Sequence, residues 1–104
     1  MRRYRTLAQV FTRTDVETAF GGRSVNWTPL VALWVQLPSP QRREDGSGEA
    51  KPIVTEKILA ESRTDPRVEA GQRVDVEGIA WRLVHVDLDA PRMGCMTLTL
   101  TREL

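Results

Sequence analysis

Cysteine and histidine are scarce in this sequence, with one of each in 104 residues, Cys95 and His85. A single cysteine forms no internal disulfide and no zinc site by itself, so we predict a buried small residue in a protein of a reducing compartment. His85 lies between Val84 and Val86, and no serine or cysteine motif marks a nucleophile. We therefore predict a protein that is not an enzyme and needs no cofactor.

Long hydrophobic runs and strong net charge are also lacking. Hydrophobic residues make up 40% of the chain but form no segment of membrane-spanning length, and the formal net charge is +1. A small net charge argues against a protein that coats nucleic acid by bulk electrostatics. The N-terminus has the charges of an export signal, but polar residues from Gln9 to Thr14 interrupt its apolar part. We expect one globular domain over residues 1–104, with no membrane partner.

One segment lacks the apolar residues that a small domain needs for its core. It reads LPSPQRREDGSGEAKP from Leu37 to Pro52, with no apolar residue between Pro40 and Ala50. Loops of this length without secondary structure are uncommon in compact domains, and they often carry function. We predict that residues 39–52 form a long flexible hairpin loop.

The second half of the chain has clear strand patterns. Met96, Leu98 and Leu100 alternate with threonines, which is typical of a half-buried strand. QRVDV at 72–76 and IAWRLVHVDL at 79–88 flank a short turn and predict a hairpin. The apolar side switches within the second of these segments, which indicates either a bulge or burial on both faces.

The first half predicts further strands with less regular patterns. We expect one strand over residues 7–13, a flexible connection at FGGR (20–23), and two strands within residues 25–37 with a kink at Pro29. Residues 53–62 suit either a helix or a strand. The predicted class is all-β: a small antiparallel barrel or sandwich of about six strands, with at most one short helix.

Few residues suggest chemistry. Asp87 and Asp89 share a strand face and could hold a metal, but the sequence offers no further ligands at a defined spacing, so we favour a solvated strand end. Trp27, Trp34 and Trp81 could stack on bases, although their apolar surroundings favour packing in a core or an interface. The alternative function is therefore a small nucleic-acid-binding β-barrel, which would use an exposed tryptophan and the arginines Arg2, Arg3, Arg5, Arg42 and Arg43.

Read in order, the features resemble the head-tail joining family of tailed bacteriophages, also called head-closure or stopper proteins. The first half supplies a Gly-Gly connection, a tryptophan, a strand ending in LWV, and a Pro-Ser-Pro before the polar loop. The second half supplies RTDP, GQRV, a glycine followed by Trp81 and Leu83, and a terminal strand. The resemblance covers roughly residues 7–103 and depends on the order of these motifs.

This resemblance implies a structural virion protein of a tailed phage, or of a phage-like particle such as a gene transfer agent. It would form a cyclic homo-oligomer, a hexamer or dodecamer, in the virion neck after synthesis in the host cytoplasm. Its partners would be the portal or adaptor protein above, the tail terminator or tail tube protein below, and genomic DNA, contacted without sequence specificity. The resemblance also assigns residues 53–63 as a strand.

Two sets of site residues follow from the resemblance. The loop would face the channel and the DNA through six residues: Gln41, Arg42, Arg43, Glu44, Asp45 and Lys51. Contacts between subunits would involve Trp34, Val35, Arg63 and Asp65. No catalytic or metal-binding residue is predicted.

Overall fold

The computed structural model describes residues 4–38, 41–45, 53–88 and 93–103, with the backbone alone for residues 41–45, 53 and 54. All regular structure in these ranges is β-strand, and none of it is a helix that could cross a membrane. The strands are β1 (Tyr4–Glu17), β2 (Arg23–Leu37), β3 (Gln41–Asp45), β4 (Ile53–Arg63), β5 (Arg73–Val76), β6 (Ile79–Asp87) and β7 (Cys95–Glu103). The predicted all-β class is confirmed.

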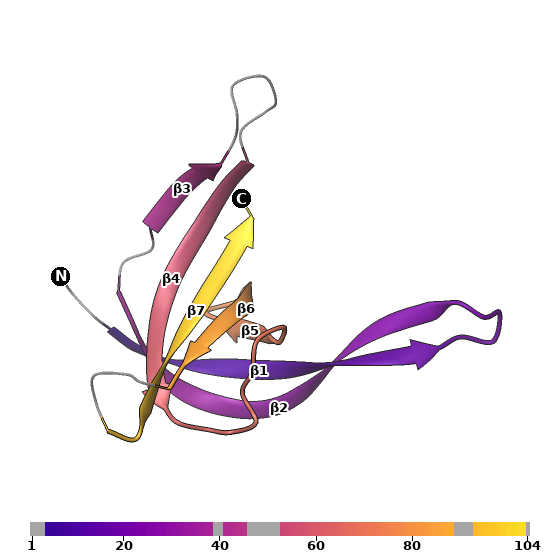
Figure 1. The fold of residues 1–104 in the computed structure, drawn as a ribbon, viewed down its shortest axis with the longest axis horizontal. Coiled ribbons are helices and arrows are strands. Elements are labelled where there is room, and N and C mark those ends of the chain that lie inside the picture. The colour runs from indigo at the N-terminus through magenta and orange to yellow at the C-terminus, as the bar shows by residue number, and fades with distance from the viewer. Residues whose placement is uncertain (1–3, 39–40, 46–52, 89–92, 104) are drawn as a thin grey trace.

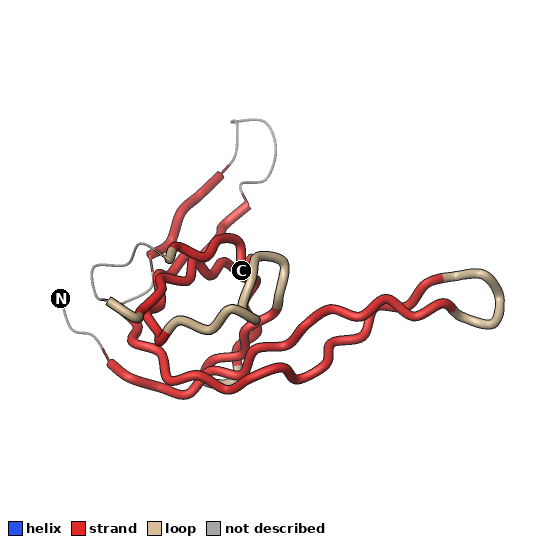
Figure 2. Tube along the Cα trace, turned by 60° about the horizontal axis from the view of Figure 1, so that its bottom comes forward, coloured by secondary structure: helices blue, strands red, loops and turns tan. Residues whose placement is uncertain are grey.

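The strands form one antiparallel sheet that closes on itself (Figures 1 and 2). Its order is β2-β1-β5-β6-β7-β4-β3, and a further pairing of Gln36 in β2 with Glu61 in β4 joins the sheet into a ring of six strands. β3 lies outside this ring, paired only with the first half of β4. Closure removes most of the open strand edges, which suits a domain of this size.

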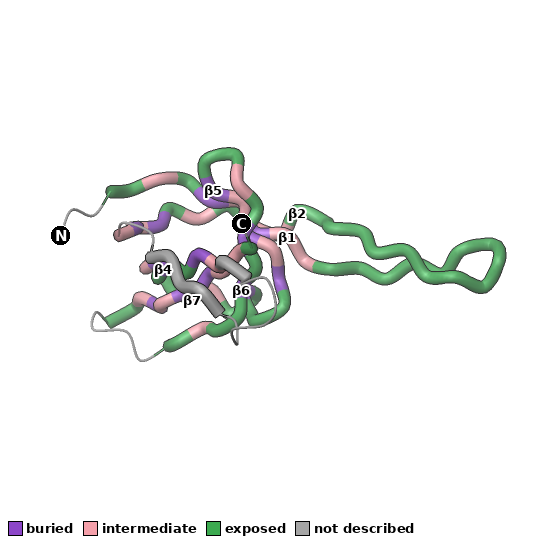
Figure 3. Tube along the Cα trace, turned by 90° about the horizontal axis from the view of Figure 1, so that it is seen from above, coloured by how far each residue is buried: buried purple, intermediate pink, exposed green. Residues whose placement is uncertain are grey.

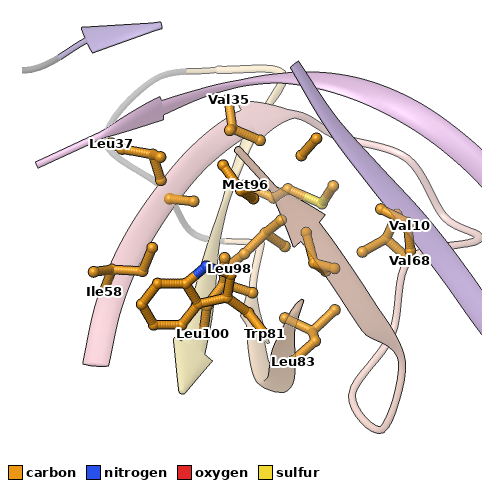
Figure 4. Packing of buried hydrophobic residues seen from close by; sticks show 14 residues of the cluster. Val10, Val35, Leu37, Ile58, Val68, Trp81, Leu83, Met96, Leu98 and Leu100 are labelled. Atoms are coloured by element: carbon orange, nitrogen blue, oxygen red, sulfur yellow. The ribbon is translucent and has the colours of Figure 1, made fainter. Parts of the chain in front are cut away.

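The core fills the inside of the ring (Figure 4). Alternate residues of each strand point inward, so the predicted run of Met96, Leu98 and Leu100 is fully buried on β7. Trp81 on β6 packs among them and is 5% exposed. The remaining core residues are Ala8, Val10, Val35, Leu37, Ile58, Ala60, Val68, Val74, Val76 and Leu83.

Two irregularities that the sequence predicted are present in the sheet. The pairing of β6 with β7 shifts between Leu83 and His85, which explains why the apolar side of β6 switches. On β2, Val31 pairs with Val10 whereas Pro29 pairs with Phe11, so Leu30 is an extra residue in the strand. The bulge accommodates Pro29 within one continuous strand, where we expected two strands with a kink.

The turn between β5 and β6 is also as predicted. Glu77 has a φ of 53° and Gly78 a φ of 77°, the combination found in tight hairpin turns whose twist matches the strands. Residues 53–63, which suited helix or strand by propensity, form β4, as the resemblance implied. Pairing with β7 along its whole length from Thr55 overrides the helix propensity of its Glu, Lys and Ala residues.

Part of the predicted loop is a strand. Gln41–Asp45 forms β3, paired with β4 from Gln41–Lys57 to Asp45–Ile53, and the other residues of the 39–52 segment lie outside the described ranges. The expectation of a loop throughout 39–52 was therefore wrong for these five residues. Their polar sequence shows no apolar alternation, because β3 lies outside the ring that encloses the core.

Prediction for the core: replacing Leu98 with Ala should lower the free energy of unfolding by about 2–5 kcal/mol, because it opens a cavity among fully buried neighbours. The matched control is Leu59→Ala on β4, where the same atoms are removed from a side chain that is 48% exposed. Urea unfolding followed by tryptophan fluorescence measures both. Equal losses for the two variants would contradict this account of the core.

Candidate functional site

Beyond the core, β1 and β2 continue as a two-stranded ribbon, here called the arm (residues 12–28). The other ring strands accompany β1 only as far as Phe11, which pairs with Arg73 of β5. Pairing of β1 with β2 nevertheless continues to Glu17 and Arg23. Figures 1 and 3 show the arm extending away from the ring with almost every residue exposed. The Cα radius of gyration is accordingly 15.7 Å, against about 13 Å for a compact chain of this length.

The two faces of the arm differ in chemistry. One face carries only small or polar pairs apart from Val16: Thr12–Thr28, Thr14–Asn26 and Val16–Ser24. The other face places a charged residue of β1 beside a residue of β2 at each step: Arg13–Trp27, Asp15–Val25 and Glu17–Arg23. Arg13 and Asp15 form an ion pair at 3.0 Å along this face. Two exposed apolar side chains, Trp27 and Val25, thus lie beside charged residues, a combination found at surfaces that meet a partner.

The tip of the arm is a hydrogen-bonded turn that holds an aromatic side chain in solvent. The Thr18 amide donates to the Gly22 carbonyl at 2.7 Å, the Thr18 hydroxyl donates to the same oxygen at 3.0 Å, and the Gly21 amide donates to the Thr18 carbonyl. Gly21 has a φ of 79°, which a side chain would strain. Phe20 sits on this turn and is 100% exposed.

A cleft of about 460 Å³ lies where the arm meets the ring. The arm supplies Arg13 and Trp27, and the ring supplies Arg73, Arg82 and Trp81, together with Gly71, Gln72 and Ala80. Three guanidinium groups beside a partly exposed indole can hold an anionic group together with an aromatic or apolar body. We call this hollow the arginine cleft.

Arg73 and Arg82 face each other directly across β5 and β6. Like charges in this arrangement destabilise a sheet unless other groups compensate. Arg73 is compensated, because Asp75 accepts two hydrogen bonds from it at 2.7 and 3.0 Å, which raise the pKa of Arg73, and because its guanidinium lies over the Phe11 ring. The Arg82 side chain forms no ion pair or hydrogen bond with any described residue. Its guanidinium is the cleft's group available to a ligand or partner.

Inside the ring, a buried ion pair closes one end of the core. Glu56 on β4 is 4% exposed and accepts a hydrogen bond of 2.6 Å from Arg102 on the neighbouring β7. The Arg102 guanidinium also lies over the Trp81 ring, 5.1 Å from its centroid. These contacts hold the Trp81 indole in the core, and its chain neighbours Ala80 and Arg82 face outward from β6 and line the arginine cleft.

The predicted channel residues are placed only in part. Gln41, Arg42, Arg43, Glu44 and Asp45 lie on β3, which extends from the ring in a different direction from the arm (Figure 1). Lys51 lies outside the described residues. Contact of this segment with a channel or with DNA stays a prediction.

The predicted interface residues separate into three environments. Trp34 is 57% exposed, lies under the Arg5 guanidinium and lines a hollow of about 220 Å³ with Arg63. Val35 is 1% exposed in the core, because alternate residues of β2 face inward, so it is not available for a surface contact. Asp65 binds Arg67 through both carboxylate oxygens. The roles of Trp34, Arg63 and Asp65 between subunits stay predictions.

Among the predicted interface residues that the structure describes, Asp65 has a lowered side-chain pKa. Side-chain hydrogen bonds from Arg67, followed by a hydrogen bond from its backbone amide, lower the pKa of the Asp65 carboxyl. The charged form is therefore favoured in the folded chain. Its small contribution to stability is present above the pKa of the unfolded chain and is lost as the pH falls through the lower folded value.

The weaker sequence candidates do not gather into a metal site in the described part of the chain. Among the described residues, no group of three or more His, Cys, Asp or Glu side chains could hold a metal ion. His85 and Asp87 are exposed on β6, and Asp89 lies outside the described ranges. Cys95 is a free thiol of intermediate burial, less buried than we predicted.

No protein-family model matches the sequence, and no curated protein does. Solved structures match over nearly its whole length. A chain in the virion of a native gene transfer agent particle has a TM-score of 0.73 and 16% identity, covering 100% of this chain and 97% of that one. The protein xkdH of the phage-like element PBSX from Bacillus subtilis has a TM-score of 0.64 and 8% identity, covering 98% and 96%. The chain shares its fold with these proteins.

This fold agrees with the one that the resemblance to the head-tail joining family implied. Sequence reasoning missed the arm, however, and with it the arginine cleft. The pairs Arg13–Trp27, Asp15–Val25 and Glu17–Arg23 would have marked a hairpin if β1 and β2 had been aligned about Thr18–Gly22. That alignment is hard to recognise because neither face of the arm is uniformly apolar.

Prediction for the buried ion pair: Arg102→Met should cost about 3–5 kcal/mol of unfolding free energy, because it leaves the Glu56 carboxylate buried without its partner. Changing both residues, Arg102→Met with Glu56→Leu, should recover most of that loss. Arg67→Met, which breaks the exposed pair with Asp65, is the control and should cost much less. Chemical unfolding of the four proteins, wild type included, tests this; no recovery in the double variant would contradict it.

Proposed function

We propose that this chain is a non-enzymatic structural protein of the neck of a tailed phage or of a phage-like particle such as a gene transfer agent. In this proposal it is a head-tail connector of the stopper type, made in the host cytoplasm. It forms a ring below the portal, closes the DNA channel after packaging and offers the tail its attachment surface. The observation that carries the proposal is the end-to-end match of fold with a chain of a gene transfer agent virion.

The architecture supports this proposal physically. A closed ring of subunits needs two different complementary surfaces on each copy. Here a small core carries two extensions that leave it in different directions, the arm and the β3–β4 hairpin (Figure 1). One extension can bind a neighbouring subunit while the other reaches toward the channel. DNA held in a channel needs obstruction and contact with its backbone, without readout of its bases.

Prediction for the channel segment: particles carrying this protein without residues 41–51 should package DNA but then lose it, or fail to acquire tails. The reason is that the deletion removes the proposed obstruction together with β3, while the ring of six strands keeps its pairings. Nuclease-protected DNA per particle and electron microscopy of tails measure the two effects.

A control of equal length separates obstruction from charge. In it, Gly and Ser replace residues 41–51 without shortening the segment, so closure that depends on length survives, whereas closure that depends on Arg42, Arg43 and Lys51 does not. Unchanged thermal unfolding confirms that each variant folds. Full, tailed and infectious particles from the deletion would exclude the gating role. An electron-microscopy map of the neck would test the proposed location directly.

One observation favours the alternative function, a small nucleic-acid-binding β-domain. Trp34 is largely exposed and has the Arg5 guanidinium 5.6 Å from its ring centroid, a pair of groups that suits stacking on bases. If this is the function, short single-stranded DNA should quench tryptophan fluorescence, with an affinity that falls as salt rises. Trp34→Phe should remove most of the quenching, whereas Trp27→Phe is the matched control. Absence of binding at low salt would eliminate this alternative.

A further inference from the structure

The tip of the arm holds Phe20 in solvent, where its ring buries no surface in the isolated chain. The side chain is 100% exposed, although the turn beneath it is fixed by three hydrogen bonds between Thr18, Gly21 and Gly22. A large aromatic side chain on an ordered support is the kind of residue that anchors protein interfaces, because it buries much area at small cost in conformational entropy. The Phe20 side chain therefore has the properties of an interface anchor that inserts into a pocket of a partner.

The arginine cleft has the properties of a receptor for this tip. Its volume of about 460 Å³ lies within the usual range for binding pockets, and its lining includes the partly exposed side chain of Trp27. A phenyl ring entering it would meet the Trp27 side chain and the guanidinium group of Arg82. In the single chain the Arg73 guanidinium already lies over the Phe11 ring, whereas the Arg82 guanidinium has no such aromatic contact with a described residue.

Charge complements shape at the same two places. Glu17 is the last residue of β1 before the tip, and its side chain forms no ion pair or hydrogen bond within the described part of the chain. Arg23 lies opposite in register but forms no ion pair with Glu17 there. Arg82 in the cleft lacks an anionic partner in the same way. A tip seated in the cleft would bring an unpaired carboxylate to an unpaired guanidinium, which favours specific docking.

The tip does not reach the cleft of its own chain. Arg13 and Trp27 at the cleft pair with each other, and continuous pairing of β1 with β2 leads from them to Glu17 and Arg23. The four steps along β1 from Arg13 to Glu17 carry the tip about 13 Å beyond the cleft. The tip and the cleft are two different surfaces of one molecule. A contact between them is therefore heterologous, with the arm of one copy meeting the root of the arm on the next copy.

We propose that Phe20 inserts into the arginine cleft of a second copy of this chain and that Glu17 pairs there with Arg82. Repeated around an axis, this head-to-tail contact closes a ring. The role of that ring in a virion neck rests on the proposed function. The contact itself does not, because it involves only two copies of this chain.

Cysteine trapping tests the contact, with Cys95→Ser as the background. One protein carries Ala19→Cys beside Phe20, and the other carries Ala80→Cys in the cleft. A disulfide needs Cα atoms within about 7 Å, so these positions do not cross-link within one chain. We expect a covalent dimer when the two proteins are mixed and oxidised at high concentration. Phe20→Ser in the first protein should reduce its yield at least about tenfold, because the anchor is lost.

Charge reversal tests the proposed ion pair. Glu17→Arg or Arg82→Glu alone should weaken self-association, measured by sedimentation, by about tenfold or more, and the chain carrying both changes should recover it. Arg67→Glu, an equal change of charge on an exposed arginine, is the control and should have no effect. A yield that is unaffected by Phe20→Ser, or a double reversal without recovery, would overturn the proposal.

The same cysteines in intact particles separate this inference from the proposed function. If the chain is present in purified particles but the cross-link is absent, or joins the chain to a different virion protein, the docking is wrong and the neck role stands. If the cross-link forms in solution but the chain is absent from particles, the docking is right and the neck role fails.

Discussion

β1 and β2 stay paired from Tyr4–Leu37 to Glu17–Arg23, whereas the rest of the ring accompanies them only as far as Phe11. The paired strands β1 and β2 therefore lie partly in the ring and partly in solvent. Its first half contributes buried residues to the core, and its second half is a ribbon with solvent on both sides. The extra residue Leu30 opposite Val10 and Phe11 lies at the change, where a bulge increases local twist. A two-stranded ribbon is only marginally stable alone in water, so the arm depends on the core at one end and would gain stability from the proposed partner at the other.

The ion pair of Glu56 and Arg102 couples the core to the surface. Arg102 lies over the buried Trp81 ring, and the chain neighbours of Trp81, Ala80 and Arg82, line the cleft at the root of the arm. A buried pair of this kind contributes little net stability compared with apolar residues of equal size. Its value here is positional, because it fixes the tryptophan in the core and with it the part of β6 that carries Ala80 and Arg82. The cleft is thus rigid on the ring side, and preorganisation of a receptor lowers the entropy lost when a partner enters.

The sequence predicted what depends on local alternation and turn chemistry. The strand through Met96, Leu98 and Leu100 and the turn at Glu77–Gly78 follow from periodicity and turn chemistry. The switch of the apolar side in β6 indicated either a bulge or burial on both faces, and the structure has the bulge. β3 was missed because it contributes nothing to the enclosed core and so shows no apolar alternation. The arginine cleft was missed because it joins Trp27 to Arg73 and Arg82, and only the pairing of β1 with β5 brings such distant segments together. Val35 was misjudged because composition does not reveal which face of a strand points inward.

The two-stranded construction of the arm limits how its length can change over evolution. Because side chains alternate along a strand, adding two residues to each strand lengthens the ribbon by about 6–7 Å and leaves Trp27, Phe20 and Glu17 facing as before. Adding a single residue to each would turn the tip to the opposite face. Neither change would alter the packing of the core, because none of its buried residues lies between the bulge and the tip of the arm. The reach of the arm can therefore vary in discrete steps while the ring of six strands stays the same, and in the proposed docking the distance between neighbouring copies would vary with it.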